Sequence, residues 1–387
     1  MRSTGMRSTE PGVPAGPLDE VVAGLPLVDH HVHGALRAAV DRPTFESMIT
    51  EGPRPHSAGT AFDSQVGFAI RRWCAPLLDL EPHAPAEEYW ARRCELGEDE
   101  VNRRLLGAAG TDTYLVETGY LGDAVLTPPE HAEAAGAAAH EVVRLETLAE
   151  GLLGAVDSGR AFVAEYPSVL EEATRAAVGT KSIIAYRAGF DVDPARPGEA
   201  DVAAAVDRLL GSASGRVRVE DPVLLRHLLW CGVDRGLPLQ LHSGYGDPDL
   251  DLHRANPLLL MPWLRRVEPT GVPVMLLHNY PYHREAGYLA QAFDNVYFDV
   301  GLGLFYSGSQ SAQIVAESLE VAPFTKQLYS SDAWGPSELH LLGALLWRRG
   351  VSRVVGQWVQ DGEWARSDAE RVVRLIGHEN ARRVYRL

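Results

Sequence analysis

The run LPLVDHHVHG at residues 25–34 constrains this chain most strongly. It is an apolar run typical of a buried strand, and it ends in two histidines two residues apart. Side chains of a strand alternate between faces, so His31 and His33 point the same way while Val32 points into the opposite layer. Neutral imidazole is the commonest protein ligand of metal ions. The run predicts either a strand with two metal ligands at its carboxyl end or a polar strand end held by its own hydrogen bonds.

Eight apolar runs of strand length recur along the chain, and each ends in polar residues followed by a helix-like stretch. Strands that alternate with helices are typical of parallel βαβ units, and eight such units favour a closed barrel over an open sheet. We therefore predict the α/β class and a (β/α)8 TIM barrel. The expected strands span residues 25–32, 111–117, 142–146, 181–187, 237–242, 272–278, 296–300 and 327–332.

The connection between the first two expected strands is too long for a simple crossover. Residues 35 to about 107 contain helix-like text interrupted by Pro and Gly near positions 52–59. We predict a helical insertion over the barrel mouth, since long insertions in such barrels commonly shape the pocket or a subunit contact. Residues 1–17 contain no apolar stretch of signal-peptide length, and we expect a disordered leader before a single domain of residues 18–387.

The composition disfavours several classes of function. The 387 residues carry a formal net charge of -16, which opposes contact with the phosphate backbone of nucleic acids. Three scattered cysteines without a CxxC motif indicate neither a disulfide framework nor a cysteine-rich zinc site. No segment approaches an apolar membrane span. We expect a cytoplasmic protein that acts on a small molecule and binds neither nucleic acid nor membrane.

Three further candidate ligands stand where later expected strands end. His242 closes LPLQLH, His278 closes VPVMLLH and Asp332 closes LYSSD. In barrels of this kind, catalytic residues come from the carboxyl ends of several strands. Each residue alone could be a core histidine or a helix-capping aspartate, but together with His31 and His33 they predict one metal centre. These ligands, with one position left to water, suit Zn2+ best, with Mn2+ or Fe2+ as alternatives.

This pattern of an HxH strand, two later histidines and a final aspartate resembles the amidohydrolase superfamily. The closing text GHENARRVYRL is similar to the end of the branch that includes metal-dependent decarboxylases and lactone hydrolases. Residues 242–345 resemble the amidohydrolase part of nodulin-type and FluG-type proteins, which is often fused to a glutamine-synthetase-like domain. That association implies hydrolysis of a γ-glutamyl amide to glutamate and an amine, and the resemblance implies a homodimer.

The resemblance also implies roles for individual residues. It makes His31, His33, His242 and Asp332 the metal ligands. His278 either orients water and transfers protons at a single metal or ligates a second metal. Asp332 could combine metal contact with proton transfer, because one carboxylate oxygen can ligate while the other accepts a proton.

Lys181 is one of only two lysines in the chain. Three interpretations stay open: a carbamylated lysine that bridges two metals, a cation that holds a substrate carboxylate, or a strand-start lysine that reaches solvent. Its expected place at a strand start favours the last, because ligands gather at strand ends. A strand that ends near Lys181 would instead favour the bridge. Arg187 would then be the anion-binding candidate, since a guanidinium can hold a carboxylate with two hydrogen bonds.

Further pocket candidates lie near the expected strand ends. The loop GDPDLDLHRANP after the fifth strand could receive an ammonium group, or it could be a solvated turn rich in Asp and Pro. The sequence fixes no role for the individual candidates. They are Glu117, Tyr120, Glu146, Tyr245, Asp247, Asp249, Asp251, His253, Arg254, His283 and Arg284.

These features predict a metal-dependent hydrolase of C–N (amide) bonds, because a divalent metal lowers the pKa of a water molecule to about 7 and the water can then attack a carbonyl. The metal and His278 would stabilise charge on the carbonyl oxygen, and Asp332 would pass a proton to the leaving amine. Two alternatives stay open. One is a nonoxidative decarboxylase of a small carboxylic acid with the same ligands, and the other is a non-catalytic barrel that serves in signalling or binding.

Overall fold

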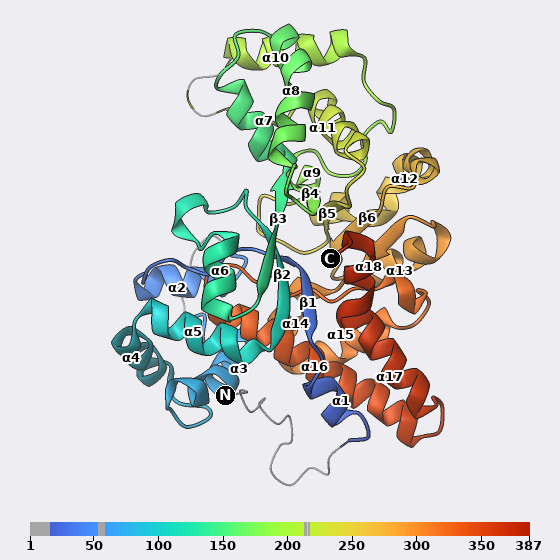
Figure 1. The fold of residues 1–387 in the computed structure, drawn as a ribbon. Helices are drawn as coiled ribbons and strands as arrows, with labels where there is room; N and C mark the ends of the chain where they lie inside the picture. The colour runs from blue at the N-terminus through green and yellow to red at the C-terminus, as the bar shows by residue number, and fades with distance from the viewer. Residues whose placement is uncertain (1–15, 53–58, 213–214, 216) are drawn as a thin grey trace.

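The computed structural model describes residues 16–387 apart from 53–58, 213–214 and 216. Most of the expected leader, residues 1–15, therefore lies outside the described residues. Within them, seven parallel strands form one sheet in chain order, which curls around a common interior (Figure 1). The strands are β1 (Leu27–Val32), β2 (Thr111–Glu117), β3 (Ala138–Arg144), β4 (Gly179–Ser182), β5 (Leu239–Ser243), β6 (Val274–His278) and β7 (Val296–Phe298).

The eighth expected strand, at residues 327–332, is an irregular segment that lies between the two edge strands of the sheet. The Leu328 N–H donates to the Phe298 carbonyl of β7 at 3.0 Å, and the Asp332 N–H donates to the His31 carbonyl of β1 at 3.1 Å. Within the described residues it forms only an isolated bridge to β7 and no regular ladder. The prediction of eight regular strands is not confirmed, yet the segment brings the last ligand candidate beside the first strand.

Helices alternate with the strands and pack outside the sheet (Figure 1). Their starts follow ordinary capping chemistry: the Asp41 carboxylate accepts from the Thr44 N–H at the start of α2, and the Asp221 carboxylate accepts from the Val223 N–H at the start of α11. The α-helices up to β5 are α1 (Asp19–Ala23), α2 (Arg42–Met48), α3 (Gln65–Ala69), α4 (Ala86–Leu96), α5 (Glu98–Ala109), α6 (Pro128–Ala135), α7 (Leu145–Leu153), α8 (Gly159–Ala173), α9 (Ile184–Arg187), α10 (Glu199–Ser212) and α11 (Pro222–Asp234). Those after β5 are α12 (Met261–Val267), α13 (His283–Ala292), α14 (Gly301–Ser307), α15 (Ser311–Ser318), α16 (Ser337–Gln360), α17 (Arg366–Arg374) and α18 (Asn380–Tyr385).

The long connection between β1 and β2 contains α2 to α5 and packs against the C-terminal part of the chain. Arg93 of α4 is buried and donates to Glu338 of α16 at 2.8 Å, and it also pairs with Glu98 at 2.8 Å. Helix α5 packs along α16. The helical content expected for residues 35–107 is therefore present, and buried ion pairs fix it to the body of the protein.

Two strand predictions are corrected near β4. Strand β3 ends at Arg144, so Glu146 lies in the first turn of α7 rather than at a strand end. Strand β4 ends at Ser182 and Arg187 ends the short helix α9. The Glu146 carboxylate accepts from the Ser182 hydroxyl at 2.5 Å and from the Ile183 N–H at 3.0 Å, which turns the chain out of the sheet. Lys181 consequently lies at the carboxyl end of its strand, not at its start.

Strand β1 departs from simple alternation because its pairing with β2 shifts register between Asp29 and Val32. Such a bulge re-aims side chains. His30 thereby turns inward as well as His31, and its ring nitrogens lie 3.0 Å from Asp299 Oδ2 and 3.1 Å from the Tyr385 hydroxyl. The two adjacent histidines therefore contact different groups: His30 contacts Asp299 and Tyr385, whereas His31 faces Gln240 and Asp332.

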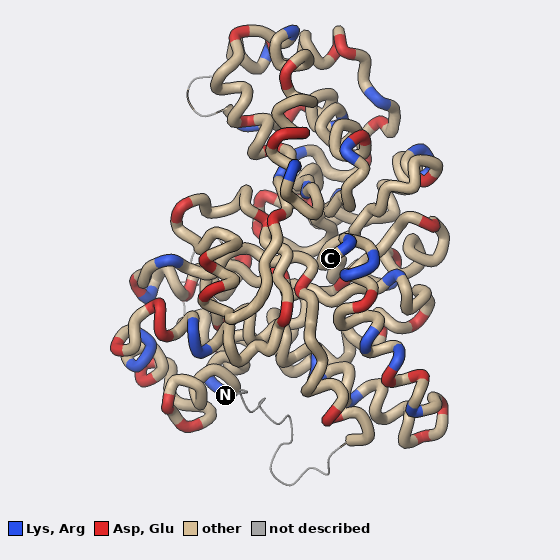
Figure 2. Tube along the Cα trace, viewed as in Figure 1, with Lys and Arg blue, Asp and Glu red and all other residues tan. Residues whose placement is uncertain are grey.

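The interior is apolar at one level and polar at the other. A compact group of buried side chains from the strands and the C-terminal helix fills the apolar level: Val28, Leu115, Val142, Met275, Leu277, Leu328 and Tyr385. A larger apolar cluster packs the outer helices onto the sheet. Figure 2 shows acidic and basic residues interspersed along the outer helices.

No helix in the described part of the chain is long and apolar enough to cross a lipid bilayer.

Candidate metal centre and its cavity

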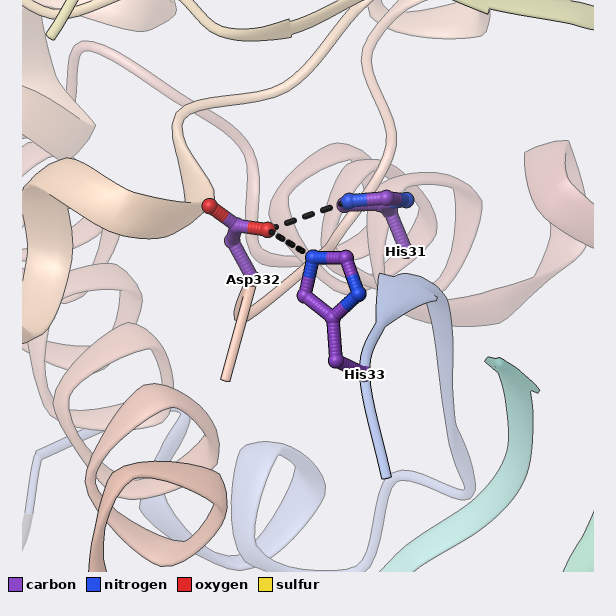
Figure 3. A group of neighbouring side chains, drawn as sticks. All are labelled: His31, His33 and Asp332. Carbon is purple, nitrogen blue, oxygen red and sulfur yellow. Dashed lines mark ion pairs between the residues drawn. The ribbon is translucent and has the colours of Figure 1, made fainter. Parts of the chain in front are cut away.

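Three of the expected ligands meet where β1 and the segment after β7 end (Figure 3). Asp332 Oδ1 lies 3.0 Å from His31 Nε2 and 3.6 Å from His33 Nε2. One candidate ligand atom from each of these three buried residues lies within 4.8 Å of the other two. Figure 3 shows the carboxylate beside the two imidazoles, with one oxygen turned toward both rings. This spacing is compatible with a cation held by all three residues.

Two further histidines complete a ring of imidazoles around this carboxylate. The His278 Nε2 atom lies 3.3 Å from Asp332 Oδ2, and the His278 and His242 ring centres are 4.7 Å apart. Among the described residues, neither nitrogen of His278 nor the Nε2 atom of His242 has a hydrogen-bond partner of good geometry. Buried polar atoms in native proteins are rarely left unpaired, so these nitrogens indicate a missing partner at the centre.

Gln240 orients His31. The Gln240 side-chain amide donates to the His30 carbonyl and to the Tyr385 hydroxyl, each at 2.8 Å, so its oxygen faces His31 Nδ1 at 2.8 Å. The network therefore assigns the proton to Nδ1 and leaves a lone pair on Nε2. That lone pair faces the Asp332 oxygen at 3.0 Å and the Lys181 ammonium nitrogen at 3.1 Å, so the two acceptors share a site that favours a positive charge.

The protonation states suit metal binding. Burial lowers the pKa of His31 to about 3 and that of His278 to about 4, and it lowers the pKa of His242 well below its usual range. For Asp332, burial opposes ionisation, but the surrounding histidines prevail and hold its pKa well below the usual range. His31, His242 and His278 are therefore neutral and Asp332 is ionised at neutral pH, the forms in which these groups bind metals. His33 differs, because hydrogen bonds to Asp332 and Glu117 outweigh burial and raise its pKa, so it must lose its proton to bind a metal.

Lys181 lies inside the centre, which overturns its expected place at a strand start near solvent. Its ammonium nitrogen lies 3.1 Å from His31 Nε2, and the side chain is buried. Burial lowers its pKa to about 8, although Asp332 and Glu117 act in the opposite direction. Of the three interpretations, solvent exposure is wrong, whereas a bridging role and a cationic role both remain compatible with this position.

Strained backbone holds the ligand candidates. His278 has a φ of 67°, Asn279 of 63° and Asp332 of 54°, all in the left-handed region that few non-glycine residues occupy. The Asn279 side chain donates to the Leu276 and Asp299 carbonyls at 2.7 and 3.0 Å, which fixes this turn. Residues held in such conformations cluster at functional sites.

A cavity of about 800 Å³ opens onto the centre. His33, Lys181, His242 and Asp332 form its floor. Charged residues of both signs line its walls, together with aromatic rings. Besides the floor, its lining includes Glu51, Tyr120, Arg144, Glu150, Tyr186, Arg187, Arg218, Asp247, Asp249 and Trp334. This volume is within the range of small-molecule sites.

Several substrate candidates lie at or below this cavity. Arg187, Asp247, Asp249 and Tyr120 line it. Glu117 is buried beneath it, where its Oε2 lies 3.1 Å from His33 Nδ1 and also contacts the Arg144 guanidinium. Glu117 therefore orients a ligand candidate from behind and does not face the cavity.

Other candidates lie elsewhere. His283 Nε2 pairs with Glu317 at 2.6 Å, and Arg284 pairs with Glu320 at 2.9 Å on the outer surface, so neither lines the cavity. Tyr245 packs edge-on against Tyr280 and Tyr306 outside the lining. The assignment of these three residues to substrate binding is corrected, because none of them belongs to the cavity lining: His283 and Arg284 pair with acidic residues, and Tyr245 packs among tyrosines. Arg254 pairs on the surface with Asp191, and neither Asp251 nor His253 reaches the cavity lining.

The structure adds cavity residues that sequence reasoning missed. Burial, together with the nearby charge of Asp332, raises the pKa of Glu51 to about 7. Glu51 follows α2 within the long connection and reaches the cavity from outside the curled sheet, while Tyr186 packs against His242 with ring centres 4.5 Å apart. The pattern of strand ends gives no signal for a residue on an insertion. Tyr186 adjoins Arg187 and could have been found with it.

Comparison with known proteins gives consistent results. The Amidohydrolase family model matches residues 83–387, beginning after the HxH strand. The protein fluG of Emericella nidulans is 29% identical over 405 residues, which cover 94% of this chain and 46% of fluG. The chain spans about half the length of this curated relative.

Solved structures share the fold. A Lactobacillus casei protein described as a metal-dependent hydrolase superposes with a TM-score of 0.83 and 27% identity, over 96% of this chain and 98% of that one. Uronate isomerases of Thermotoga maritima and Bacillus halodurans superpose with TM-scores of 0.61 and 0.65 at 13% and 14% identity. The first alignment covers 95% of this chain and 97% of that one, and the second covers 95% of both. The isomerases are similar in fold alone.

Proposed function

Because this chain belongs to the amidohydrolase family, we propose that it is a metal-dependent hydrolase of amide bonds that cleaves a γ-glutamyl amide into glutamate and an amine. The family match and the group of His31, His33 and Asp332 support a hydrolase-type enzyme with a metal centre. The bond and the substrate are the proposal.

One observation carries the proposal: an unprotonated imidazole nitrogen of His31 faces the ionised Asp332 carboxylate at 3.0 Å. Two acceptors buried this close need a positive charge beside them. The Lys181 ammonium, 3.1 Å from the same nitrogen, supplies one, and the unpartnered nitrogens of His242 and His278 favour a metal ion as well. We propose that His31, His33, His242 and Asp332 hold the metal. Zn2+ is the metal that this donor set suits best, and Mn2+ and Fe2+ suit it as well.

When bound, a divalent cation would acidify water and polarise the carbonyl of the amide. The residues of the chain would do the rest. Asp332 Oδ2 lies on the side of the carboxylate that faces His278, 3.3 Å from Nε2, so a proton accepted there can pass to a leaving amine. His278, neutral at pH 7 because burial lowers its pKa, can donate a hydrogen bond to the carbonyl oxygen as charge develops.

The position of Lys181 is compatible with either one or two metal ions, and an experiment can distinguish the two cases. Its buried nitrogen is close enough to His31 to bridge two metals after carbamylation, with His278 ligating the second. Uncarbamylated, its ammonium would offset the negative charge of Asp332 and Glu117. Mass spectrometry of the intact holoprotein distinguishes the two states, because carbamylation adds a carboxyl group to the chain.

The γ-glutamyl class is supported by the resemblance of residues 242–345 to FluG-type proteins and by the alignment to fluG over 94% of the chain. The mixed charge of the cavity walls also favours a substrate that carries charges of both signs over an apolar amide. A cytoplasmic homodimer completes the proposal, and light scattering on the purified protein tests its subunit number.

A panel of γ-glutamyl alkylamides incubated with zinc-loaded protein tests the reaction. We expect glutamate and amine to appear in equal amounts, and chelation to stop both. Small carboxylic acids are assayed beside them for release of CO2. CO2 without hydrolysis would establish the decarboxylase instead, and bound metal with no turnover of either group would establish a non-catalytic barrel.

A further inference from the structure

A buried ion pair lies in the cavity wall away from the ligand candidates. Arg187, the last residue of α9, and Glu150 of α7 both line the cavity, and their nearest charged atoms are 3.3 Å apart. The side chains are 9% and 10% exposed, respectively. Helix α7 belongs to the lobe of α7, α8, α10 and α11 at the top of Figure 1, so the pair joins this lobe to the barrel mouth.

The guanidinium of Arg187 is poorly satisfied for a buried cation. Among the described residues its Nε and Nη1 atoms have no hydrogen-bond partner, and its contact with Glu150 is long for a charge-assisted bond. Burial lowers the pKa of Arg187, which Glu150 only partly offsets. A guanidinium with unpartnered donors beside a cavity is suited to a carboxylate, which would bind along the edge formed by Nη2 and one of these two nitrogens.

Glu150 is a complementary acceptor. Its Oε1 atom accepts from the Val219 N–H at 3.1 Å and also faces Arg187, while no contact holds its Oε2 atom within the described residues. A ligand with an ammonium beside a carboxylate could replace this strained pair with two better ones. The carboxylate would take Nη2 of Arg187 from Glu150 together with one of the two unpartnered donors, and the ammonium would take the Oε2 atom of Glu150.

We propose that Arg187 and Glu150 form a receptor for an α-amino acid group, the end of the substrate that carries an α-carboxylate and an α-ammonium. This inference rests on the proposed function, in which that group is the far end of the γ-glutamyl moiety while the amide lies at the metal. In this proposal, Arg187 and Glu150 select γ-glutamyl amides over amides that lack an α-amino acid group. The sequence predicts Arg187 as an anion-binding residue, and the structure places the acidic side chain of Glu150 beside it.

Calorimetric binding of three small acids to the zinc-loaded protein tests the receptor without relying on turnover. L-Glutamate carries both groups, glutarate lacks the ammonium and 4-aminobutyrate lacks the α-carboxylate. We expect wild-type protein to bind glutamate at least about tenfold more tightly than either analogue. Arg187→Gln should weaken glutamate binding at least about tenfold and remove its advantage over 4-aminobutyrate.

Glu150→Gln should remove the advantage of glutamate over glutarate while leaving glutarate binding unchanged or stronger. Glutamine can still accept from the Val219 N–H, which preserves the local fold. Arg187→Lys keeps the charge without the fork and should give intermediate affinity. Arg284→Gln, on the outer surface beside Glu320, is the matched control and should bind as wild type does.

Equal glutamate affinity in the Arg187→Gln and Arg284→Gln variants would overturn the inference, as would undiminished preference for glutamate over glutarate in Glu150→Gln. Failure of the proposed reaction gives a different result: tight, Arg187-dependent glutamate binding with no hydrolysis of any γ-glutamyl amide would support the receptor and reject the amidase.

Discussion

At the residue scale, the site depends on a few side chains that the backbone holds in uncommon conformations. Asp332 adopts a φ of 54° and places one carboxylate oxygen near His31 and His33 and the other near His278. Aspartate and asparagine tolerate this left-handed region better than most residues. The charge of Asp332 can therefore be removed without changing the backbone.

Asp332→Asn should lower turnover of a γ-glutamyl amide by at least about a thousandfold, because it removes both a ligand and the proton acceptor. Its thermal unfolding midpoint without metal should stay within a few degrees of wild type. Steady-state kinetics and calorimetry measure the two quantities. Asp368→Asn, exposed on α17, serves as the control, and an Asp332→Asn enzyme with more than a tenth of wild-type turnover would contradict the assignment.

Gln240 provides a second test at this scale. Gln240→Met removes the acceptor that fixes the His31 tautomer, and we expect the dissociation constant for zinc to rise about 10- to 100-fold. Turnover at saturating zinc should fall much less, since no reacting atom is removed. Competition with a chromogenic chelator measures the affinity. Unchanged zinc affinity would show that the hydrogen bond to His31 does not orient it for a metal.

At the scale of elements, the sequence predicts strands well where apolar runs end cleanly and poorly where a local interaction ends them. β2 has the predicted bounds, because Thr111–Glu117 is a β-rich run after a helix-ending glycine. The run KSIIAYR reads as one strand, but the Glu146 carboxylate captures Ser182 and Ile183 and starts α9. These hydrogen bonds come from Glu146, which precedes Ser182 by 36 residues, so the apolar pattern of the run itself does not reveal where the strand ends.

The connection between β1 and β2 offers a prediction about pH. Glu46 of α2 accepts from Arg42 at 2.7 Å, from the Thr60 hydroxyl at 2.6 Å and from the Ala61 N–H at 2.8 Å. Burial acts to raise its pKa, but these bonds prevail and lower it. A lowered pKa means that the stabilisation is complete above the unfolded value, near 4.3, and disappears as the pH falls through the folded value.

Glu46→Gln should therefore reduce the free energy of unfolding by about 1–2 kcal/mol at pH 7, and the gap from wild type should shrink steadily below about pH 4. Urea unfolding at a series of pH values measures this gap. Glu88→Gln, exposed on α4, is the control. A gap that stays constant down to pH 3 would mean that the carboxylate charge contributes nothing.

At the scale of the molecule, the candidate metal centre lies across the seam between the first strand and the irregular segment after the last. His31 and His33 come from β1, and Asp332 comes from the segment that hydrogen-bonds to it. A metal held by both would link the two edges of the sheet. Metal binding should therefore stabilise the whole fold.

Zinc at a hundredfold excess over its dissociation constant should stabilise the folded chain by about 2.7 kcal/mol and raise the unfolding midpoint by about 3–5 °C. Differential scanning calorimetry with and without a chelator checks this expectation. The same shift in a His31→Ala variant would mean that zinc stabilises the protein from another site.

The ligand candidates could be predicted from the sequence because parallel strands place their carboxyl ends at one edge, so His242 and His278 converge with His31. The cavity walls could not be predicted in the same way. Glu51 reaches the site from the insertion, and Glu150 reaches it from α7. Such residues meet the site only through tertiary packing, which leaves no periodic signal along the chain.

The most direct test of the account is the number of zinc ions bound per chain, measured by equilibrium dialysis and elemental analysis on wild-type and His242→Ala proteins. We expect one or two tightly bound ions in wild type and at least a tenfold weaker affinity in His242→Ala. A wild-type protein that binds no zinc, manganese or iron tightly, or a variant that binds them as wild type does, would contradict a metal centre at these residues.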